Sequence, residues 1–415
     1  MREQNIEVFT VGGGLKLAVE PIEGAATTTM AWTVPVGFAG DPIGDLGCGE
    51  ASVLAEVVLR GAGDRTSKEY SDALDRLGAQ RGSSCSAYRM SISATCLGGE
   101  TDQVLSLLSD VFLRPRIEQS ALDASRELVL QSLQSLSDDP QHFVGIKTSE
   151  IALPAPFNRH GLGTEAGLAS LTTESLRAAW HRRCRPGGSI IGIAGAVDAK
   201  SVRDHLEKLL EGWSGTAAEP VVTAPAIGGT IHEKQPSSQT HMCLAFASPK
   251  ERDIERLPHR VAVRILGGGG MSNRLFTEVR EKRGLCYSVG MSYGCGRDRS
   301  LTTVYAGSTP ERAGETLACI RKELAEMAKG VTQEEFNRAI IGVKSSIVIS
   351  GEGTGARASL LASDLFTRGT VRTLAEILAS IDHLTLAQVN DHVAKMFTPR
   401  MLESASLAVI GPGAL

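Results

Sequence analysis

The sequence predicts an α+β protein made of two duplicated domains, each a largely antiparallel or mixed sheet covered by helices. Three observations predict this class. The chain of 415 residues is long enough for two cores, its halves repeat the same order of strand-like and helix-like segments, and an irregular segment separates them. Apolar residues make up 42% and charged residues 22% of the chain, as is typical of a globular protein.

The separating segment lies at 211–233 and reads EGWSGTAAEPVVTAPAIGGTIHE. It is rich in glycine, alanine, proline and threonine and has no helical period, so it is expected to be a linker. We therefore predict an N-terminal domain over 1–212, a linker over 213–230 and a C-terminal domain over 231–415.

The two halves resemble each other at an offset of about 210 residues. Each opens with strand-like segments, TTTMAWTVPVGF in one and THMCLAFASP in the other, and continues into a helix that ends in glycine, ASVLAEVVLRGAG or LPHRVAVRILGGGG. A pair of alternating strands and two long helices follow in both. Short turns such as GCGRD predict largely antiparallel sheets with helices on one face.

The helix predicted at 49–63, GEASVLAEVVLRGAG, has an apolar stripe of Ala51, Leu54 and Val58 that is expected to be buried. Nothing in this segment alone indicates chemistry.

Composition excludes several classes of function. A net charge of −4 and an aromatic content of 4% give no basic or stacking surface for nucleic acid. No apolar run of 18 residues predicts a membrane span, and the first residues lack the apolar middle region of a signal peptide. Eight scattered cysteines are expected to be free thiols, which favours the cytoplasm and leaves a trimmed export signal open.

Two longer segments carry a family resemblance. LGGGGMSNRLFTEVREKRGLCYSVGMSY in the second half and HGLGTEAGLASLTTESLRAAWHRRCRPGGSIIGIAGAVD in the first resemble the insulinase/pitrilysin metallopeptidases, in particular the branch of processing peptidases with half-size subunits. The resemblance covers essentially the whole chain, including the repeat and the linker. It implies an inverted zincin fold, in which a first-half helix carries His-x-x-Glu-His and a later helix supplies a glutamate as the third zinc ligand.

The resemblance places the metal-site positions on residues that do not bind zinc. The two histidine positions fall on Ser52 and Glu56, the position of the general base falls on Ala55, and the distal glutamate falls on Ser132. Ser52, Ala55 and Glu56 share a helix face at the i, i+3, i+4 spacing, so the geometry is kept while the ligands are lost.

Histidines elsewhere do not restore the site. No two of them stand three or four residues apart; they are His142, His160, His181, His205, His232, His241, His259, His383 and His392. Alanine at position 55 cannot abstract a proton. We therefore expect no metal and no cofactor in this chain, and no peptide hydrolysis by the chain alone.

The resemblance assigns a substrate-binding role to two residues of the second half, Arg280 and Tyr287. Arg280 is expected near the end of the helix SNRLFTEVREKRG, and Tyr287 on a strand whose face also carries Val289, Met291 and Tyr293. A guanidinium and a phenol could stabilise a developing oxyanion. From residue type alone, a solvated helix end and a core tyrosine remain the alternatives.

The glycine run Gly267–Gly270 lacks the spacing of a nucleotide-binding loop and is expected to end a helix in the left-handed conformation and to allow close backbone approach. Whether so short a run handles substrate is left open. The basic clusters at 114–116 and 181–186 are expected to be solvated loop or helix-end charges.

These observations lead to one leading hypothesis and two alternatives. The chain is expected to be the non-catalytic subunit of a heterodimeric zinc metalloendopeptidase, with zinc in a homologous partner subunit and a peptide as substrate. The alternatives are a structural core-type subunit and a free-standing peptide-binding homodimer without proteolysis. The sequence names neither the substrate nor the partner.

Overall fold

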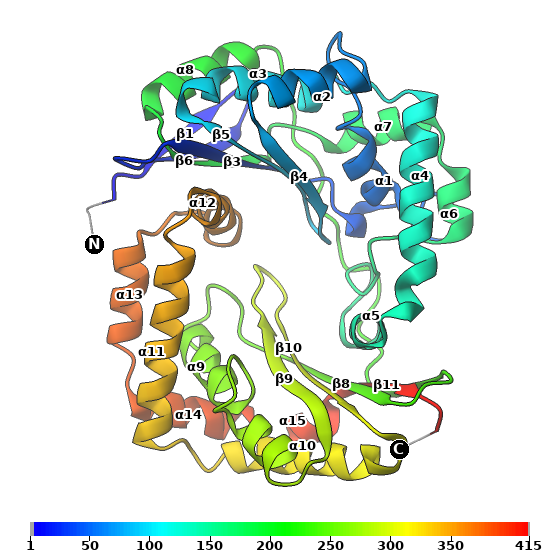
Figure 1. Cartoon of the computed structure of the whole chain (residues 1–415), viewed down its shortest axis with the longest axis vertical. Helices are drawn as coiled ribbons and strands as arrows, with labels where there is room; N and C mark the ends of the chain where they lie inside the picture. Colours follow the sequence, from blue (N-terminus) through cyan, green and yellow to red (C-terminus); the bar gives the residue numbers. More distant parts are fainter. Residues whose placement is uncertain (1–3, 414–415) are drawn as a thin grey trace. The chain divides into compact units, whose positions relative to one another are not determined.

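The computed structural model describes residues 4–413, which form two compact units (Figure 1). The first unit takes up residues to 135, 159–222 and 350–374, and the second unit residues 136–158, 223–349 and from 375 onward.

The first unit contains a six-stranded sheet in the order β1-β2-β6-β3-β5-β4. β2 and β6 are parallel, and all other neighbours are antiparallel. The strands are β1 (Glu7–Val11), β2 (Leu15–Pro21), β3 (Thr27–Val34), β4 (Gln80–Cys85), β5 (Met90–Leu97) and β6 (Ile190–Gly195).

The second unit contains a five-stranded sheet in the order β7-β11-β8-β10-β9, with β7 and β11 parallel and the other neighbours antiparallel. The strands are β7 (Thr230–Lys234), β8 (Thr240–Ala247), β9 (Cys286–Gly294), β10 (Leu301–Ser308) and β11 (Ser406–Gly411). Without β1, the first sheet has the same order and the same strand directions, so the topology confirms the duplicated α+β fold.

Helices cover both faces of the first sheet. On one face, Trp32 of β3 packs with Leu54 and Phe112 in the large core of the unit. The helices that contribute to this core are α1 (Glu50–Val57), α2 (Ser67–Arg76), α3 (Thr101–Leu113), α4 (Gln119–Gln134), α6 (Glu165–Ser170), α7 (Thr173–Arg183) and α8 (Ala199–Leu209). On the other face, Ala31 packs against α12 (Thr354–Arg368) through Ala358 and Leu361.

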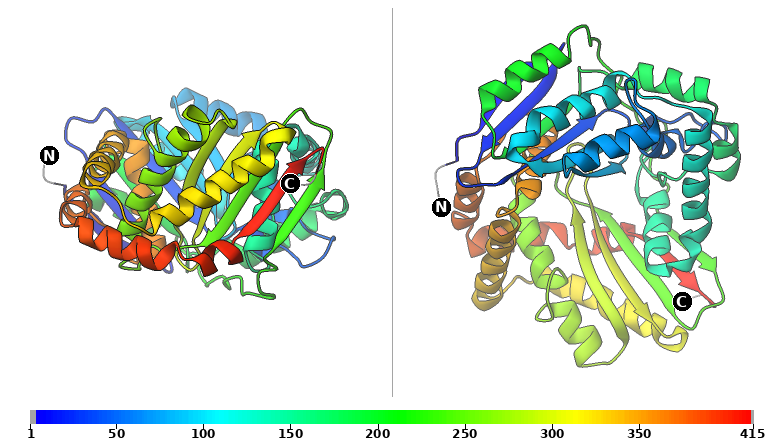
Figure 2. Two further views of the ribbon diagram at one scale, coloured as in Figure 1. Left: turned by 90° about the horizontal axis from the view of Figure 1, so that it is seen from below. Right: turned by 45° about the horizontal axis from the view of Figure 1, so that its top comes forward.

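Helices also cover both faces of the second sheet. Val144 of α5 (Pro140–Ala152) packs against Cys243, Ala408 and Ile410. On the opposite face lie α9 (Arg256–Leu266) and α10 (Ala313–Met327), and the left view of Figure 2 shows α10 (yellow) lying across the strands. The other helices of this unit are the π-helix η4 (Phe276–Glu281), α11 (Gln333–Ser350), α13 (Leu374–Asp382), α14 (Leu386–Met396) and α15 (Pro399–Ser404).

The expectation of helices on one face of each sheet was therefore wrong. α5 and α12 occupy equivalent positions in the two repeats, but each packs on the sheet of the other repeat. The compact units consequently depart from the predicted division at 1–212 and 231–415, because residues 136–158 belong to the second unit and residues 350–374 to the first.

Four short 3₁₀ helices complete the described elements: η1 (Phe38–Gly40), η2 (Gly98–Glu100), η3 (Ser135–Asp138) and η5 (Pro310–Arg312). The segment predicted as a linker over 213–230 has only isolated bridges at Thr216 and Ala224 before β7 begins at its last residue, Thr230. Within residues 4–413, every helix is too short or too polar to cross a lipid bilayer. The eight cysteines are free thiols.

Candidate functional site

A pocket in the first unit collects the four metal-site positions that the sequence singled out. It has a volume of about 420 Å³ and lies between α1, α4 and the edge strand β4. Its lining includes Ser52, Ala55 and Glu56 of α1 and Ser132 of α4. Ala51, Leu54 and Val58 are fully buried on the other side of α1, as predicted.

The residues of this pocket do not fit a zinc ion. The Ser52 hydroxyl donates a 2.7 Å hydrogen bond to the carbonyl of Gly161, and the Ser132 hydroxyl donates a 2.9 Å bond to that of Leu128. Burial raises the pKa of the Cys85 thiol, which also lines the pocket, to about 12 and so disfavours the thiolate that binds metal. Across residues 4–413, no three His, Cys, Asp or Glu side chains stand together as a metal-binding group.

A buried ion cluster fixes the start of α1 beside the pocket. The Asp41 carboxylate accepts hydrogen bonds of 3.2 Å from the backbone N–H groups of Gly49 and Ala51. Arg183 donates to Asp41 at 3.0 Å and to Glu50 at 2.9 Å. Burial raises the pKa of Asp41 to about 6, although Arg183 acts in the opposite direction. This cluster holds the helix by its end, independently of the residues that face the pocket.

The second unit places Arg280 and Tyr287 in direct contact. The guanidinium carbon of Arg280 lies 4.8 Å from the ring centroid of Tyr287 and 4.8 Å from that of Phe276. No carboxylate among the described residues forms an ion pair with Arg280, and the Tyr287 side chain is 78% exposed. The two rings hold the guanidinium by cation–π contact and leave its N–H donors available.

The predicted face of the Tyr287 strand was wrong because the strand contains a β-bulge. Gly307 pairs with Ser288 and Ser308 with Cys286, so Tyr287 is the extra residue of β9. The bulge shifts the alternation: Cys286 and Met291 are both buried, although they stand five positions apart and would point to opposite faces of a regular strand. Tyr287 therefore does not share the core face with Met291.

The glycine run makes the expected close approach but ends its helix differently. A Cβ at Gly267 would lie 2.8 Å from side-chain atoms of both Leu275 and Met291, so only glycine fits there. Gly267 has φ −160°, however, and the left-handed conformations occur at Gly269 (φ +70°) and Gly270 (φ +80°).

Sequence reasoning missed Phe276, the second ring that holds Arg280. Its signal was present, because Phe276 stands four residues before Arg280 and so lies on nearly the same helix face. It also missed a buried polar chain in which His259 contacts His392 at 3.0 Å and Thr302 at 2.7 Å, while His392 contacts Glu255 at 2.9 Å. His392 is more than 130 residues from Glu255 and His259, and only the packing of α14 on α9 brings it to them.

The duplicated α+β unit, with a pocket on α1 at the positions where the resemblance places the metal ligands, points to the class of two-domain metallopeptidase folds. Comparisons with known proteins agree with this class. The family described as "Insulinase (Peptidase family M16)" matches residues 17–164, and the family described as "Peptidase M16 inactive domain" matches residues 170–343. The chain therefore belongs to the insulinase family of peptidases, family M16.

Related proteins match over nearly the same length. An uncharacterized zinc protease of Streptomyces coelicolor is 28% identical over 97% of this chain and 89% of its own. One of Bacillus subtilis is 26% identical over 88% of each chain.

Solved structures share the fold. A peptidase M16 inactive domain from Pseudomonas fluorescens has a TM-score of 0.90 at 20% identity, with 99% of this chain and 98% of that one covered. A chain of complex III2 from Candida albicans has a TM-score of 0.82 at 15% identity, with 98% and 96% covered.

Proposed function

We propose that this chain is the non-catalytic subunit of a heterodimeric zinc metalloendopeptidase. In this proposal a homologous subunit holds the zinc, and this chain supplies Arg280 and Tyr287 as contacts to the peptide substrate. One contrast supports it: the pocket at Ser52 and Glu56 lacks a set of metal donors, whereas the exposed Arg280–Tyr287 pair keeps groups that can bind a peptide.

The chemistry of the pair suits a peptide carbonyl. The Arg280 guanidinium is held between two rings and is not neutralised by a carboxylate of the described chain. Its N–H groups and the Tyr287 hydroxyl can donate to the carbonyl oxygen of a bound peptide. Such donors gain strength as negative charge develops on that oxygen in the partner's active site.

A sheet edge offers a second means of holding an extended peptide. β4 is an edge strand, and its residues Ser83, Ser84 and Cys85 line the pocket of the first unit. A peptide added beside β4 would gain backbone hydrogen bonds without any metal. Eight free cysteines favour a reducing compartment, which supports a cytoplasmic location.

The experiment is co-expression with a half-size homologue that carries His-x-x-Glu-His. We expect a stable complex that cleaves peptides, with about one zinc per complex and none in this chain purified alone. Arg280→Ala in this chain should lower kcat/KM of the complex by roughly 100-fold. Arg321→Ala is the matched control, because Arg321 is an exposed arginine of α10 in the same unit.

Two results would reject the proposal. One is a partner that is equally active without this chain, and the other is Arg280→Ala and Arg321→Ala giving the same turnover. A stable assembly without proteolysis would favour a structural subunit, a role that the likeness in fold to the complex III2 chain allows. Saturable peptide binding by a homodimer of the pure chain would favour the remaining alternative.

A further inference from the structure

The second unit contains a pocket built from the same elements as the pocket of the first unit. It lies between α9, β9 and α11 and has a volume of about 340 Å³. Arg260, Val263 and Arg264 of α9 line it at the i, i+3, i+4 spacing that Ser52, Ala55 and Glu56 have on α1. Two positions of this triplet are arginines. The second repeat therefore has a pocket in the same place as the first, but with positive charge where the first has the carboxylate of Glu56.

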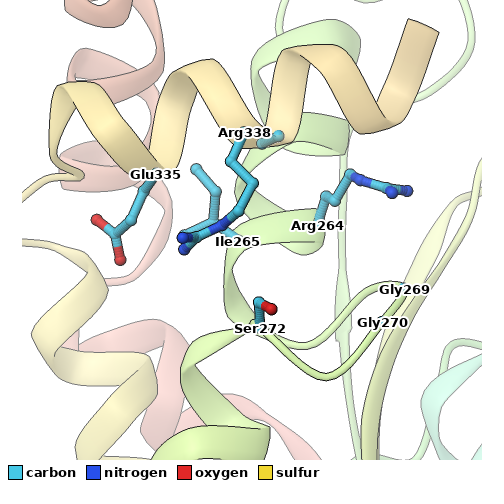
Figure 3. Close-up of a pocket in the computed structure, with 8 residues that line it drawn as sticks. Arg264, Ile265, Gly269, Gly270, Ser272, Glu335 and Arg338 are labelled. Atoms are coloured by element: carbon cyan, nitrogen blue, oxygen red, sulfur yellow. The ribbon is translucent and has the colours of Figure 1, made fainter. Parts of the chain in front are cut away.

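A smaller pocket of about 190 Å³ adjoins it, and both include Arg264 and Gly269 in their lining. Figure 3 shows this second pocket, with Arg338 extending from α11 toward Ile265 and Arg264 extending from α9 on the side of Gly269 and Gly270. Ser272 lies at the base of the loop. Arg264 of α9 and Arg338 of α11 thus both line the smaller pocket.

The arginines lack strong partners. Within residues 4–413, neither Arg260 nor Arg264 forms an ion pair or a side-chain hydrogen bond. Arg338 has a single ion pair, at 3.6 Å, with Glu334, whose side chain is 88% exposed. An ion pair of this kind contributes little, so Arg338 can exchange it for another anion.

The acidic residue in the lining does not neutralise this charge. Both carboxylate oxygens of Glu335 accept hydrogen bonds from Arg274, at 2.6 and 2.8 Å, and one accepts a 2.8 Å bond from the Thr332 N–H. Burial would raise the pKa of Glu335, but these bonds outweigh it and lower the pKa to about 2. The charge of Glu335 is therefore balanced by Arg274, and Arg264 and Arg338 leave the pocket with a net positive charge.

Two glycines set the position of the Arg264 guanidinium. A Cβ added at Gly342 of α11 would lie 2.2 to 2.5 Å from the guanidinium atoms, and one at Gly269 would lie 3.1 Å from Nη1. The guanidinium therefore rests on bare backbone between the helix and the loop. Any larger residue at position 342 would displace it.

We propose that this arginine pocket, defined by Arg260, Arg264 and Arg338 over the loop Gly267–Gly270, binds a carboxylate of the peptide substrate. An arginine fork matches a carboxylate in a bidentate geometry, and the loop N–H groups and the Ser272 hydroxyl can add donors. The carboxylate comes from the C-terminus of the peptide or from an acidic side chain. The inference rests on the proposed peptide-binding function and names a chemical class of substrate for it.

The test measures binding to the full chain by fluorescence anisotropy. The probe is a short fluorescein-labelled peptide of alternating serine and leucine in three forms: a free C-terminal acid, a C-terminal amide, and an amide with one serine replaced by glutamate. We expect the free acid, the glutamate form or both to bind roughly 10-fold tighter than the plain amide, and the form that does so identifies the source of the carboxylate.

Gly342→Ala is the decisive variant, because alanine favours a helix while its Cβ displaces Arg264. It should abolish the preference for the carboxylate without lowering the melting temperature. Gly314→Ala is the matched control, since Gly314 lies in α10 with nothing within 4 Å of an added Cβ. Arg264→Gln should act like Gly342→Ala, and Arg321→Gln should leave the preference intact.

Equal binding of all three forms would overturn the carboxylate site while leaving the proposed peptide-binding function in place. Equal effects of Gly342→Ala and Gly314→Ala would also overturn it. No binding of any form would reject both the site and the peptide-binding function.

Discussion

The pocket of the first repeat and that of the second show how far one backbone frame can serve different chemistry. Each lies between the helix after the first sheet strands, the edge strand and the second long helix of its repeat. The first has Glu56 as the one charged residue of its described lining, whereas the second is lined by Arg260 and Arg264 of α9, and Arg338 of α11 lines the smaller pocket beside it. The two repeats therefore keep the same arrangement of helices and edge strand around the pocket, while the side chains that line it differ.

The first repeat shows why its frame survives without metal ligands. α1 is held by its buried apolar stripe and by the cluster of Asp41, Glu50 and Arg183 at its start. None of these groups lines the pocket. A change on the pocket face thus leaves the supports of the helix untouched.

The largest expected effect is the gain of a zinc site in the first pocket. Combining Ser52→His, Ala55→Glu, Glu56→His and Ser132→Glu should take the chain from no bound zinc to about one zinc ion per molecule. The measurement is metal analysis after dialysis, with circular dichroism to check the fold. The version without Ser132→Glu is the control and should bind zinc much more weakly; equal retention of zinc by both would show that Ser132 is not the position of the third ligand.

Breaking the support of α1 should be the next largest effect. Arg183→Met leaves Asp41 and Glu50 buried without their cation and should cost about 3–5 kcal/mol of unfolding free energy. Arg274→Met removes the cation of a partly buried ion pair in the second repeat and should cost about 1–2 kcal/mol, because Arg274 and Glu335 are more exposed. Urea denaturation measures both, and a larger loss for Arg274→Met would contradict the comparison.

Acidification should change the stability contributed by one buried group in each repeat, Asp41 and His259, in opposite directions. The folded-state pKa of Asp41 is raised from 3.8 to about 6, so its contribution to stability is present below about pH 4 and is lost as pH rises through about 6. Burial, with His392 nearby, lowers the pKa of His259 from 6.5 to about 3, so its contribution is present above 6.5 and is lost as pH falls toward 3.

Urea denaturation between pH 4 and pH 7 tests this contrast in the variants Asp41→Asn and His259→Gln. Relative to wild type, Asp41→Asn should become less stable as pH falls, and His259→Gln should become relatively more stable, each by about 1–2 kcal/mol. The same pH slope in both variants would show that these groups do not control the difference.

The smallest effect is expected for Glu56→Gln. Because Glu56 faces a pocket without metal donors, the change should alter turnover of the complex less than about twofold and stability by less than about 0.5 kcal/mol. Peptide cleavage by the complex is the measurement, beside Arg280→Ala. A loss of activity as large as that of Arg280→Ala would mean that the first pocket takes part in catalysis.

The sequence predicted the features that depend on local pattern. Hydrophobic period and turns indicated the repeat, and the spacing of Ser52, Ala55 and Glu56 placed them on one face of α1, which the structure confirms. The face of Tyr287 could not be predicted, because a bulge is set by the pairing of β9 with β10 and not by the strand alone. The arginine pocket could not be predicted from the sequence either, because it depends on Gly342 of α11 lying against Arg264 of α9, a contact between residues distant in sequence.

The exchange of α5 and α12 between the repeats has a consequence for biosynthesis. The first sheet is covered on one face by α12, whose last residue is Arg368, so nearly the whole polypeptide must leave the ribosome before that face is closed. Until then Ala31, Ala194 and their neighbours remain open to solvent or to a chaperone. A fragment that stops near residue 212 should be prone to aggregate, and supplying the remainder in trans should rescue it.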